Sequence, residues 1–223
     1  INLFNLRRNV DNGLSIAEHP CTACAPDTTT ADIAFNIWQA DFNLISKIND
    51  WNLVQLGVSF APYQVVTEGF FSREFQDFIP SSSSEYFRAT TFTLAYIYDL
   101  IVPTKHRDIS PLGFRGFFRM NYQPSRLLDN YRIEGGSLIP VYQREENLTL
   151  EAFTRYGFPI KGLTTGMLFS RVFSYLNDPQ SIFFADYFGG ITGMRSYPFF
   201  ALGGNTTAFS VLSVITPIDS DMD

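Results

Sequence analysis

The chain has 223 residues, of which 45% are hydrophobic and only 17% are charged, whereas an average soluble domain carries roughly 25% charged residues. Its mean hydropathy of zero, and the absence of any apolar run near the roughly 20 residues that a spanning helix needs, exclude a helical membrane protein. The net charge of −6 and the lack of clustered Lys and Arg exclude a nucleic-acid partner.

The segment before Ala31 is predicted to be a loop that follows an early strand in 1–10. It contains Cys21 and Cys24, the two cysteines of the chain. A structural zinc site needs four ligands, usually supplied as two such pairs, and only two His are present. We interpret the cysteines as a small local disulfide or as two free thiols, which suits an oxidising compartment. No metal and no cofactor are expected.

From there on, apolar and polar residues alternate, with Gly, Pro, Asn and Ser recurring about every 10 to 15 residues, which is typical of strands with two different faces. In 89–99 the apolar side includes Phe92, Leu94 and Tyr96. The segments 114–122 and 147–158 alternate in the same way. Their polar sides carry the charged residues Arg115, Arg119, Glu151 and Arg155.

The strands near 32–46 and 51–62 are expected to be joined by a tight turn at 47–50 and followed by a long loop at 63–87. Outer-membrane barrels have short inner turns and longer outer loops. We therefore assign 63–87 to the outer side.

Pro103, Pro140 and Pro217 are interpreted as ends of inward-running strands, because Pro can end a ladder without losing a needed donor. That assignment makes 123–129 and 159–206 outer loops. Residues Leu163 to Tyr175 resemble a strand. If they crossed the membrane as a separate strand, the last loop would lie on the inner side instead of the outer side. They are therefore placed in a hairpin or strand extension of that loop.

Alternation alone does not distinguish a soluble sandwich from a membrane barrel. The segments run about 10 to 13 residues, close to the 9 to 11 that cross a bilayer at a tilt. Tyr and Phe gather at their ends, where aromatic girdles lie in membrane barrels. The sequence therefore predicts an all-β fold: an antiparallel transmembrane β-barrel formed by 1–223, which could lack strands at one or both ends.

No set of residues predicts catalysis. His106-Arg107-Asp108 matches three letters of a kinase catalytic loop, but the Asn expected five residues after the Asp is Gly113, and no glycine-rich phosphate loop precedes it. A hydrolase triad using His106 lacks a nucleophile-elbow sequence and would lie in a turn. We expect that the protein is not an enzyme.

The most informative segment runs from Tyr187 to Asn205 and is followed by a strand at Ala208–Ile218. It contains Gly189-Gly190, a Leu202-Gly203-Gly204 segment and, between them, Met194-Arg195-Ser196-Tyr197. This order resembles the bacterial surface-antigen superfamily, which includes the BamA-like barrel-assembly proteins and the two-partner secretion transporters. The four residues correspond to its Val-Arg-Gly-Phe/Tyr loop motif, with Ser196 in place of Gly. The resemblance covers about 90–218.

The resemblance implies an outer-membrane barrel that inserts or translocates proteins or lipids without a chemical step, within a larger polypeptide. Its partners would be outer-membrane lipid and other envelope proteins or periplasmic domains. A charged Arg195 folded into the lumen needs an acidic partner, because burying a charge alone is costly. We predict that Glu151 is this partner. The other residues predicted to face the lumen are Arg155, Arg115 and Arg119. The alternatives are a passive porin, a structural barrel that scaffolds an envelope complex, and a soluble lipid-binding β-barrel or sandwich.

Overall fold

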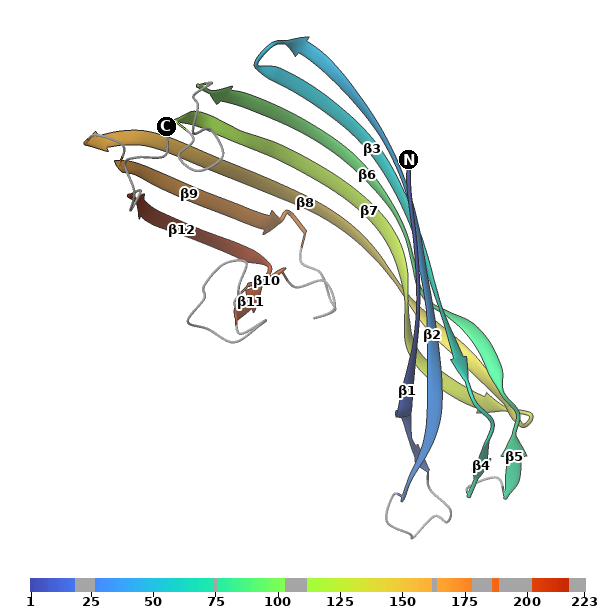
Figure 1. Ribbon diagram of the computed structural model, residues 1–223. Helices are drawn as coiled ribbons and strands as arrows, with labels where there is room; N and C mark the ends of the chain where they lie inside the picture. The colour runs from blue at the N-terminus through green and yellow to red at the C-terminus, as the bar shows by residue number, and fades with distance from the viewer. Residues whose placement is uncertain are drawn as a thin grey trace. The chain divides into compact units, whose positions relative to one another are not determined.

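The fold consists of β-strands. The computed structural model describes residues 1–18, 27–73, 76–102, 112–161, 164–177, 186–188 and 202–216, and every regular element in these ranges is a strand. Eight strands form one antiparallel sheet in the order β1-β2-β3-β6-β7-β8-β9-β12 (Figure 1). The predicted all-β, antiparallel class is therefore confirmed. The strands of this sheet are β1 Asn2–Glu18, β2 Asp27–Asn49, β3 Asn52–Thr67, β6 Ser82–Ile101, β7 Gly113–Glu134, β8 Ser137–Lys161, β9 Thr164–Tyr175 and β12 Thr206–Ile215.

Four short strands form two further hairpins. β4 (Phe70–Ser72) pairs with β5 (Asp77–Ile79), and β10 (Asp186–Phe188) pairs with β11 (Leu202–Gly204). The chain divides into two compact units, to both of which β2, β3, β6, β7 and β8 contribute. The first unit comprises Ile1–Phe42, Val58–Thr91 and Gln123–Glu145, and the second comprises Asn43–Gly57, Phe92–Tyr122 and Glu146–Asp223.

The first unit has a small apolar core beneath the β4–β5 hairpin. Phe70 pairs with Ile79 across this hairpin, and both side chains are buried, Ile79 completely. They belong to a cluster with Ala31 and Leu138. Burial of these apolar groups stabilises the hairpin, because two short strands are not stable by themselves.

The connection predicted at 63–87 is shorter than expected. β3 continues to Thr67 and β6 already begins at Ser82. The connection between these two strands is therefore limited to residues 68–81, which contain the β4–β5 hairpin. Three of the four serines at 81–84 belong to β6.

In the second unit the large apolar side chains of the strands are exposed. Phe92 is 47% exposed and stacks against Tyr122, which is 41% exposed, so neighbouring strands present their rings on one side. The registers Tyr156↔Leu168 and Leu168↔Leu212 continue this side across β8, β9 and β12. We call it the apolar side. Its exposed members are Leu44, Leu56, Phe92, Leu94, Tyr96, Phe118, Met120, Tyr122, Tyr156, Leu168, Val172, Leu212 and Val214.

The opposite side of these strands does not form a dry apolar core. Among the described residues of the second unit, Ala95 is the one buried hydrophobic residue, whereas the first unit buries Phe70, Ile79, Phe87 and Leu138. The predicted alternation in 89–99 and 114–122 is confirmed for Phe92, Leu94, Phe118 and Met120, whereas Phe117 lies on the polar side beside Arg119.

The loop predicted at 123–129 and the strand end predicted at Pro140 are both wrong. β7 runs for 22 residues and β8 for 25, passing through Pro124 and Pro140. The reversal lies instead at Gly135 and Gly136, with φ of +57° and +75°, as a two-residue hairpin of the favoured twist requires. Each Pro removes only one donor, and the other pairs of such long strands preserve the ladder.

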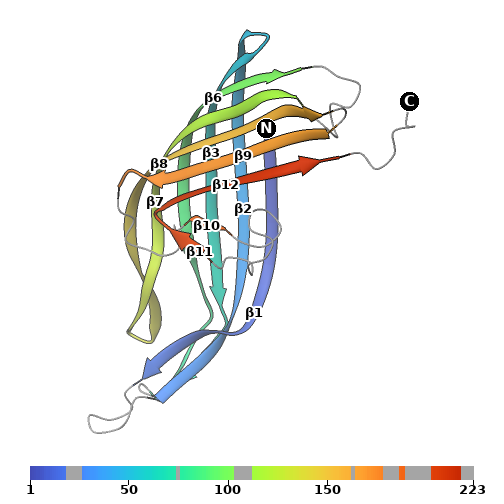
Figure 2. The same cartoon turned by 90° about the vertical axis from the view of Figure 1, so that its left-hand side faces the viewer.

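The hairpin or strand extension predicted at Leu163 to Tyr175 is also wrong, because β9 is a full member of the main sheet. Figure 2 shows β9 between β8 and β12, and residues from Thr165 to Ser174 pair with β12. The predicted loop at 159–206 is accordingly interrupted by the end of β8 and by β9. This prediction was wrong because Pro140 was taken as the end of a strand. Dividing β8 at Pro140 added one strand to the count, so every later connection was assigned to the opposite side of the membrane.

The turn predicted at 47–50 is close to the observed one. β2 ends at Asn49 and β3 starts at Asn52, which leaves Asp50 and Trp51 as the turn. Lys47 Nζ contacts Asp50 Oδ1 at 2.7 Å, and the Trp51 backbone N–H donates to Asn49 Oδ1 at 2.9 Å. The exposed Lys47 ammonium lowers the pKa of the Asp50 carboxyl by donating this hydrogen bond.

Candidate functional site

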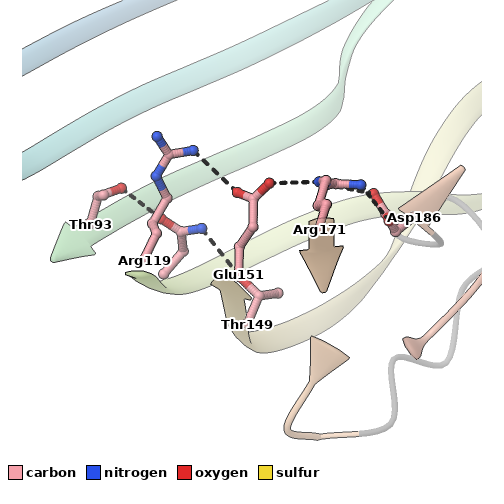
Figure 3. A network of polar contacts seen from close by, with 7 residues as sticks. Thr93, Arg119, Thr149, Glu151, Arg171 and Asp186 are labelled. Carbon is pink, nitrogen blue, oxygen red and sulfur yellow. Dashed lines mark hydrogen bonds and ion pairs between the residues drawn. The ribbon is translucent and has the colours of Figure 1, made fainter. Parts of the chain in front are cut away.

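The polar side of the second unit carries a connected set of charged side chains, which we call the polar network. Arg119 comes from β7, Glu151 from β8 and Arg171 from β9. Arg119 Nη1 donates to Glu151 Oε2 at 3.3 Å, and Arg171 Nε donates to Glu151 Oε1 at 2.8 Å (Figure 3). One carboxylate therefore links three neighbouring strands.

The register explains how Arg171 and Glu151 meet. Arg171 lies opposite Phe153 and Glu151 lies opposite Phe173, so the two charged residues are diagonal neighbours on one face. Diagonal cross-strand pairs are within reach of long side chains. The Glu151 side chain is 14% exposed and that of Arg171 is 23% exposed, so both charges are largely removed from water.

Arg171 also holds Asp186 of β10. Its Nη1 and Nη2 donate to the two carboxylate oxygens of Asp186 at 3.0 and 3.2 Å, which is a bidentate pair. Thr207 of β12 donates its hydroxyl to Asp186 Oδ2 at 2.5 Å. Asp186 in turn pairs with Gly204 across the β10–β11 hairpin. The network thereby fixes the base of the segment between β10 and β11 to the polar side of β9 and β12.

Uncharged polar groups extend the network across β6, β7 and β8. Thr93 Oγ1 donates to Asn121 Oδ1 at 2.8 Å, and Asn121 Nδ2 donates to Thr149 Oγ1 at 3.2 Å. Thr149 is buried. Because both functions of the Asn121 amide are used, this residue joins its two neighbouring strands.

An aromatic row on the same side adjoins the polar network. Phe117 stacks on Phe153 at 5.3 Å, Phe153 contacts Phe169 edge-to-face at 4.8 Å, and Phe169 stacks on Phe209 at 5.6 Å. The Arg119 guanidinium lies over the Phe117 ring at 4.6 Å. Ring faces attract cations, so the row also holds the arginine in place. The side opposite the apolar side is therefore a packed polar and aromatic wall.

Two guanidinium nitrogens in this wall lack a hydrogen-bond partner. Arg119 Nε and Arg155 Nε are buried and bond to no acceptor in the described ranges. In those ranges Arg155 also makes no ion pair. Arg119 and Arg171 contact the carboxylates of Glu151 and Asp186, whereas Arg155 contacts neither, so these five side chains carry one more positive than negative charge.

The structure brings together only some of the predicted lumen residues. Arg119 and Glu151 are in contact, and Arg155 lies on the strand of Glu151. Arg115 does not join them, because it faces Asp99 at 3.6 Å. The predicted pairing of Glu151 with Arg195 stays a prediction, because the motif Met194-Arg195-Ser196-Tyr197 lies outside the described residues. His19, Cys21, Cys24 and His106 lie outside them as well.

Arg171, Asp186 and Thr207 were not predicted from the sequence. Arg171 could have been found, because it alternates with Leu168 and Val172 in a strand-like segment that was wrongly assigned to a loop. For Asp186 the sequence carries no comparable signal, since it comes from a strand of three residues. Its role depends on the β10–β11 pairing.

Within the described part of the chain, no cluster of three or more His, Cys, Asp and Glu side chains could hold a metal ion. The same ranges contain no helix of the length and hydrophobicity that crossing a membrane would take. The carboxylates of the network are already engaged by arginines, so the arrangement positions strands and a loop base.

Comparison with known proteins adds no relative. No family model matches the chain, and no curated protein or solved structure does. The distribution of the side chains and the motif residues are therefore the observations that bear on function.

Proposed function

We propose that the chain forms part of a transmembrane β-barrel of a bacterial outer membrane. The apolar side of the second unit would face lipid, and the polar network would face the lumen. The observation that carries this proposal is that large apolar side chains such as Phe92 and Leu212 are exposed while Ala95 is the one buried hydrophobic residue in the described second unit. A membrane barrel has its apolar groups outside and its polar groups inside.

The lengths of β9 and β12 agree with this proposal, whereas the other six strands of the main sheet, of 16 to 25 residues, are longer than a crossing requires. Crossing a bilayer at a tilt takes about 9 to 11 residues. β12 has 10 residues and β9 has 12. A soluble lipid-binding barrel or sandwich would instead turn its apolar sides inward, which is the opposite of the arrangement in the second unit.

Spin labels at neighbouring positions test the orientation. The chain, with Cys21 and Cys24 replaced by Ser, would be reconstituted in liposomes and labelled at Leu94→Cys or Met120→Cys. We expect these labels to collide with oxygen, which concentrates in lipid, and to be protected from a water-soluble nickel relaxant. Thr93→Cys and Asn121→Cys are the matched controls and should not show lipid exposure. Equal access of the nickel complex to Leu94→Cys and Thr93→Cys would contradict membrane insertion.

The function that we propose for this barrel is the insertion or translocation of proteins or lipids, without a chemical step. Two observations support it. The motif Met194-Arg195-Ser196-Tyr197 resembles the loop motif of the surface-antigen superfamily. The β10–β11 pair brackets that motif, and its Asp186 is held by Arg171 and Thr207 on the polar side. A loop whose base is fixed to the wall is suited to control passage through a lumen.

An insertion assay tests this function. Liposomes with and without the chain would receive a urea-unfolded outer-membrane barrel, and its folding would be followed by its heat-modifiable gel migration. We expect the chain to accelerate folding and Arg195→Ala to remove most of that acceleration. Arg195→Ala should also raise channel conductance or protease sensitivity, because the loop is no longer held by its charge. No acceleration by the wild-type chain would contradict the insertion function.

A passive porin or a structural barrel that scaffolds an envelope complex is the second candidate. The charged wall formed by Arg119, Glu151 and Arg171 favours it, because a porin constriction uses such charges. It predicts a steady conductance in planar bilayers and no effect on the folding of another barrel. Arg195→Ala would then change conductance alone.

A further inference from the structure

A concave cavity of about 420 Å³ lies in the first unit, on β3, β6, β7 and β8. No acidic side chain lines it, although three arginines do. We call it the arginine pocket. Its main lining residues are Phe60, Arg88, Thr90, Pro124, Arg126 and Arg144.

The charges of the arginine pocket are only partly compensated. Arg126 Nη2 contacts Glu85 Oε2 at 2.5 Å, and Arg88 Nη1 contacts Glu85 Oε1 at 3.3 Å. Arg144 makes no ion pair with any described residue. One carboxylate thus serves two of the three guanidinium groups, and the pocket has an excess of positive charge.

Arg126 is held in a fixed position. Its guanidinium lies 4.2 Å from the centroid of the Tyr142 ring, and its buried Nε has no hydrogen-bond acceptor in the part of the chain described. A buried donor without an acceptor is costly. An arginine that is already ordered loses less conformational entropy when it binds a ligand.

An apolar wall adjoins the arginines. The Phe60 ring is 37% exposed and packs edge-to-face on Trp38 at 5.6 Å. Val58, two residues earlier on the same side of β3, is 41% exposed. A free anion would use the guanidinium groups alone, whereas a ligand with an anionic head and an apolar tail would use both.

We propose that the arginine pocket binds an anionic lipid, with its phosphate between Arg88, Arg126 and Arg144 and its acyl chain along Phe60. Arginine matches phosphate through parallel N–H donors. This inference rests on the proposed membrane location, because the chain must meet lipid for the site to be used. The ligand class is a phosphorylated lipid with net negative charge.

Calorimetric titration of the full chain in a neutral detergent without phosphate tests the site. The probes are dihexanoyl phosphatidic acid, glycerol 3-phosphate, which lacks the acyl chains, and dihexanoyl phosphatidylcholine, whose charge is neutralised. We expect phosphatidic acid to bind about tenfold more tightly than either of the other two. If glycerol 3-phosphate bound as tightly as phosphatidic acid, the pocket would be a site for free phosphate compounds. If phosphatidylcholine bound as tightly as phosphatidic acid, the pocket would not recognise the negative charge of the lipid. Either result overturns the proposal.

Variants locate the binding. Arg144→Gln removes a guanidinium without breaking the pairs of Glu85 and should weaken phosphatidic acid binding about tenfold, because charge-assisted hydrogen bonds to the phosphate are lost. Phe60→Ser should weaken phosphatidic acid binding but not glycerol 3-phosphate binding. The matched control is Arg132→Gln, an exposed arginine outside the pocket, which should leave affinity within about twofold of wild type. Equal losses in Arg144→Gln and Arg132→Gln would overturn the site.

The spin-label experiment separates the two proposals. Lipid exposure at Leu94 and Met120 without phosphatidic acid binding would overturn the arginine pocket and leave the membrane barrel standing. Tight phosphatidic acid binding with water exposure at Leu94 would overturn the barrel as well as the membrane setting assigned to the pocket.

Discussion

Arg171 of the second unit and the arginine pocket of the first differ in charge compensation, and Leu212 and Ile79 of the two units differ in burial. In the second unit Arg171 is enclosed by the carboxylates of Glu151 and Asp186, and the large apolar side chains are exposed. In the first unit Arg88 and Arg126 share the carboxylate of Glu85, Arg144 makes no ion pair with a described residue, and apolar side chains such as Ile79 are buried. Charge compensation therefore distinguishes an arginine that holds the fold together from one that is available to a ligand.

The apolar residues show the same contrast. A buried Ile79 stabilises the first unit by leaving water, whether or not a membrane is present. An exposed Leu212, at 66% exposure, gains nothing from folding in water, and in the proposed membrane barrel it would contact lipid. We therefore expect mutation of Ile79 to act as mutation of a buried core residue does, and mutation of Leu212 as mutation of an exposed residue does.

The largest effect is expected for Ile79→Ala. Removing a fully buried Ile from the first-unit core should lower the free energy of unfolding by about 3 kcal/mol, because it leaves a cavity. Urea unfolding in detergent, followed by tryptophan fluorescence, measures this. The matched control Leu212→Ala should cost less than about 1 kcal/mol. Similar losses for both variants would contradict the contrast between the units.

Arg171→Ala should have the next largest effect. The change leaves Glu151 and Asp186 without a common partner in a largely desolvated position, and breaking a buried pair costs about 3–5 kcal/mol. Because the Arg171 side chain is still 23% exposed, we expect about 2 kcal/mol. Limited proteolysis should then cleave the segment between β10 and β11 faster. An unchanged unfolding midpoint together with unchanged cleavage would show that the network does not anchor that segment.

Gly135→Ala tests the turn between β7 and β8. Gly135 has a φ of +57° and no atom within 4 Å of an added Cβ, so the cost comes from the left-handed backbone alone. We expect a loss of about 1 kcal/mol, measured by the same urea unfolding. Gly204→Ala is the control, because its added Cβ meets only ordinary contacts. A neutral Gly135→Ala would indicate that the hairpin reverses elsewhere.

The smallest effect is expected for Asp50→Asn. The pKa of Asp50 is lowered by Lys47, so any stability from this pair is present above the unfolded pKa of about 4 and is lost as the pH falls below it. Both side chains are exposed, at 60% and 83%, and such pairs contribute little. The unfolding midpoints of wild type and Asp50→Asn should coincide at pH 7. A clear difference there would mean that the turn is more enclosed than its exposure indicates.

Part of the fold and part of the site could be predicted from the sequence. Period-two alternation identified the strands around Phe92 and Phe118 and their two sides, because this period is a local property of the backbone. It also placed Arg119 and Glu151 on the polar sides of their strands. It did not find the reversal at Gly135, because Pro140 was taken as a strand end. Because of that single error, β9 was left out of the predicted sheet and Arg171 was not predicted to lie on its polar side.

The sequence by itself determined that the chain forms strands with one apolar and one polar side, because side chains alternate along any extended backbone. Only the tertiary structure decided which strands are neighbours, and with them the contacts of Arg171 with Glu151 and Asp186 and the gathering of Arg88, Arg126 and Arg144 at one pocket. These residues are far apart in the chain. Their proximity depends on strand order and register, which arise from pairing across the whole sheet.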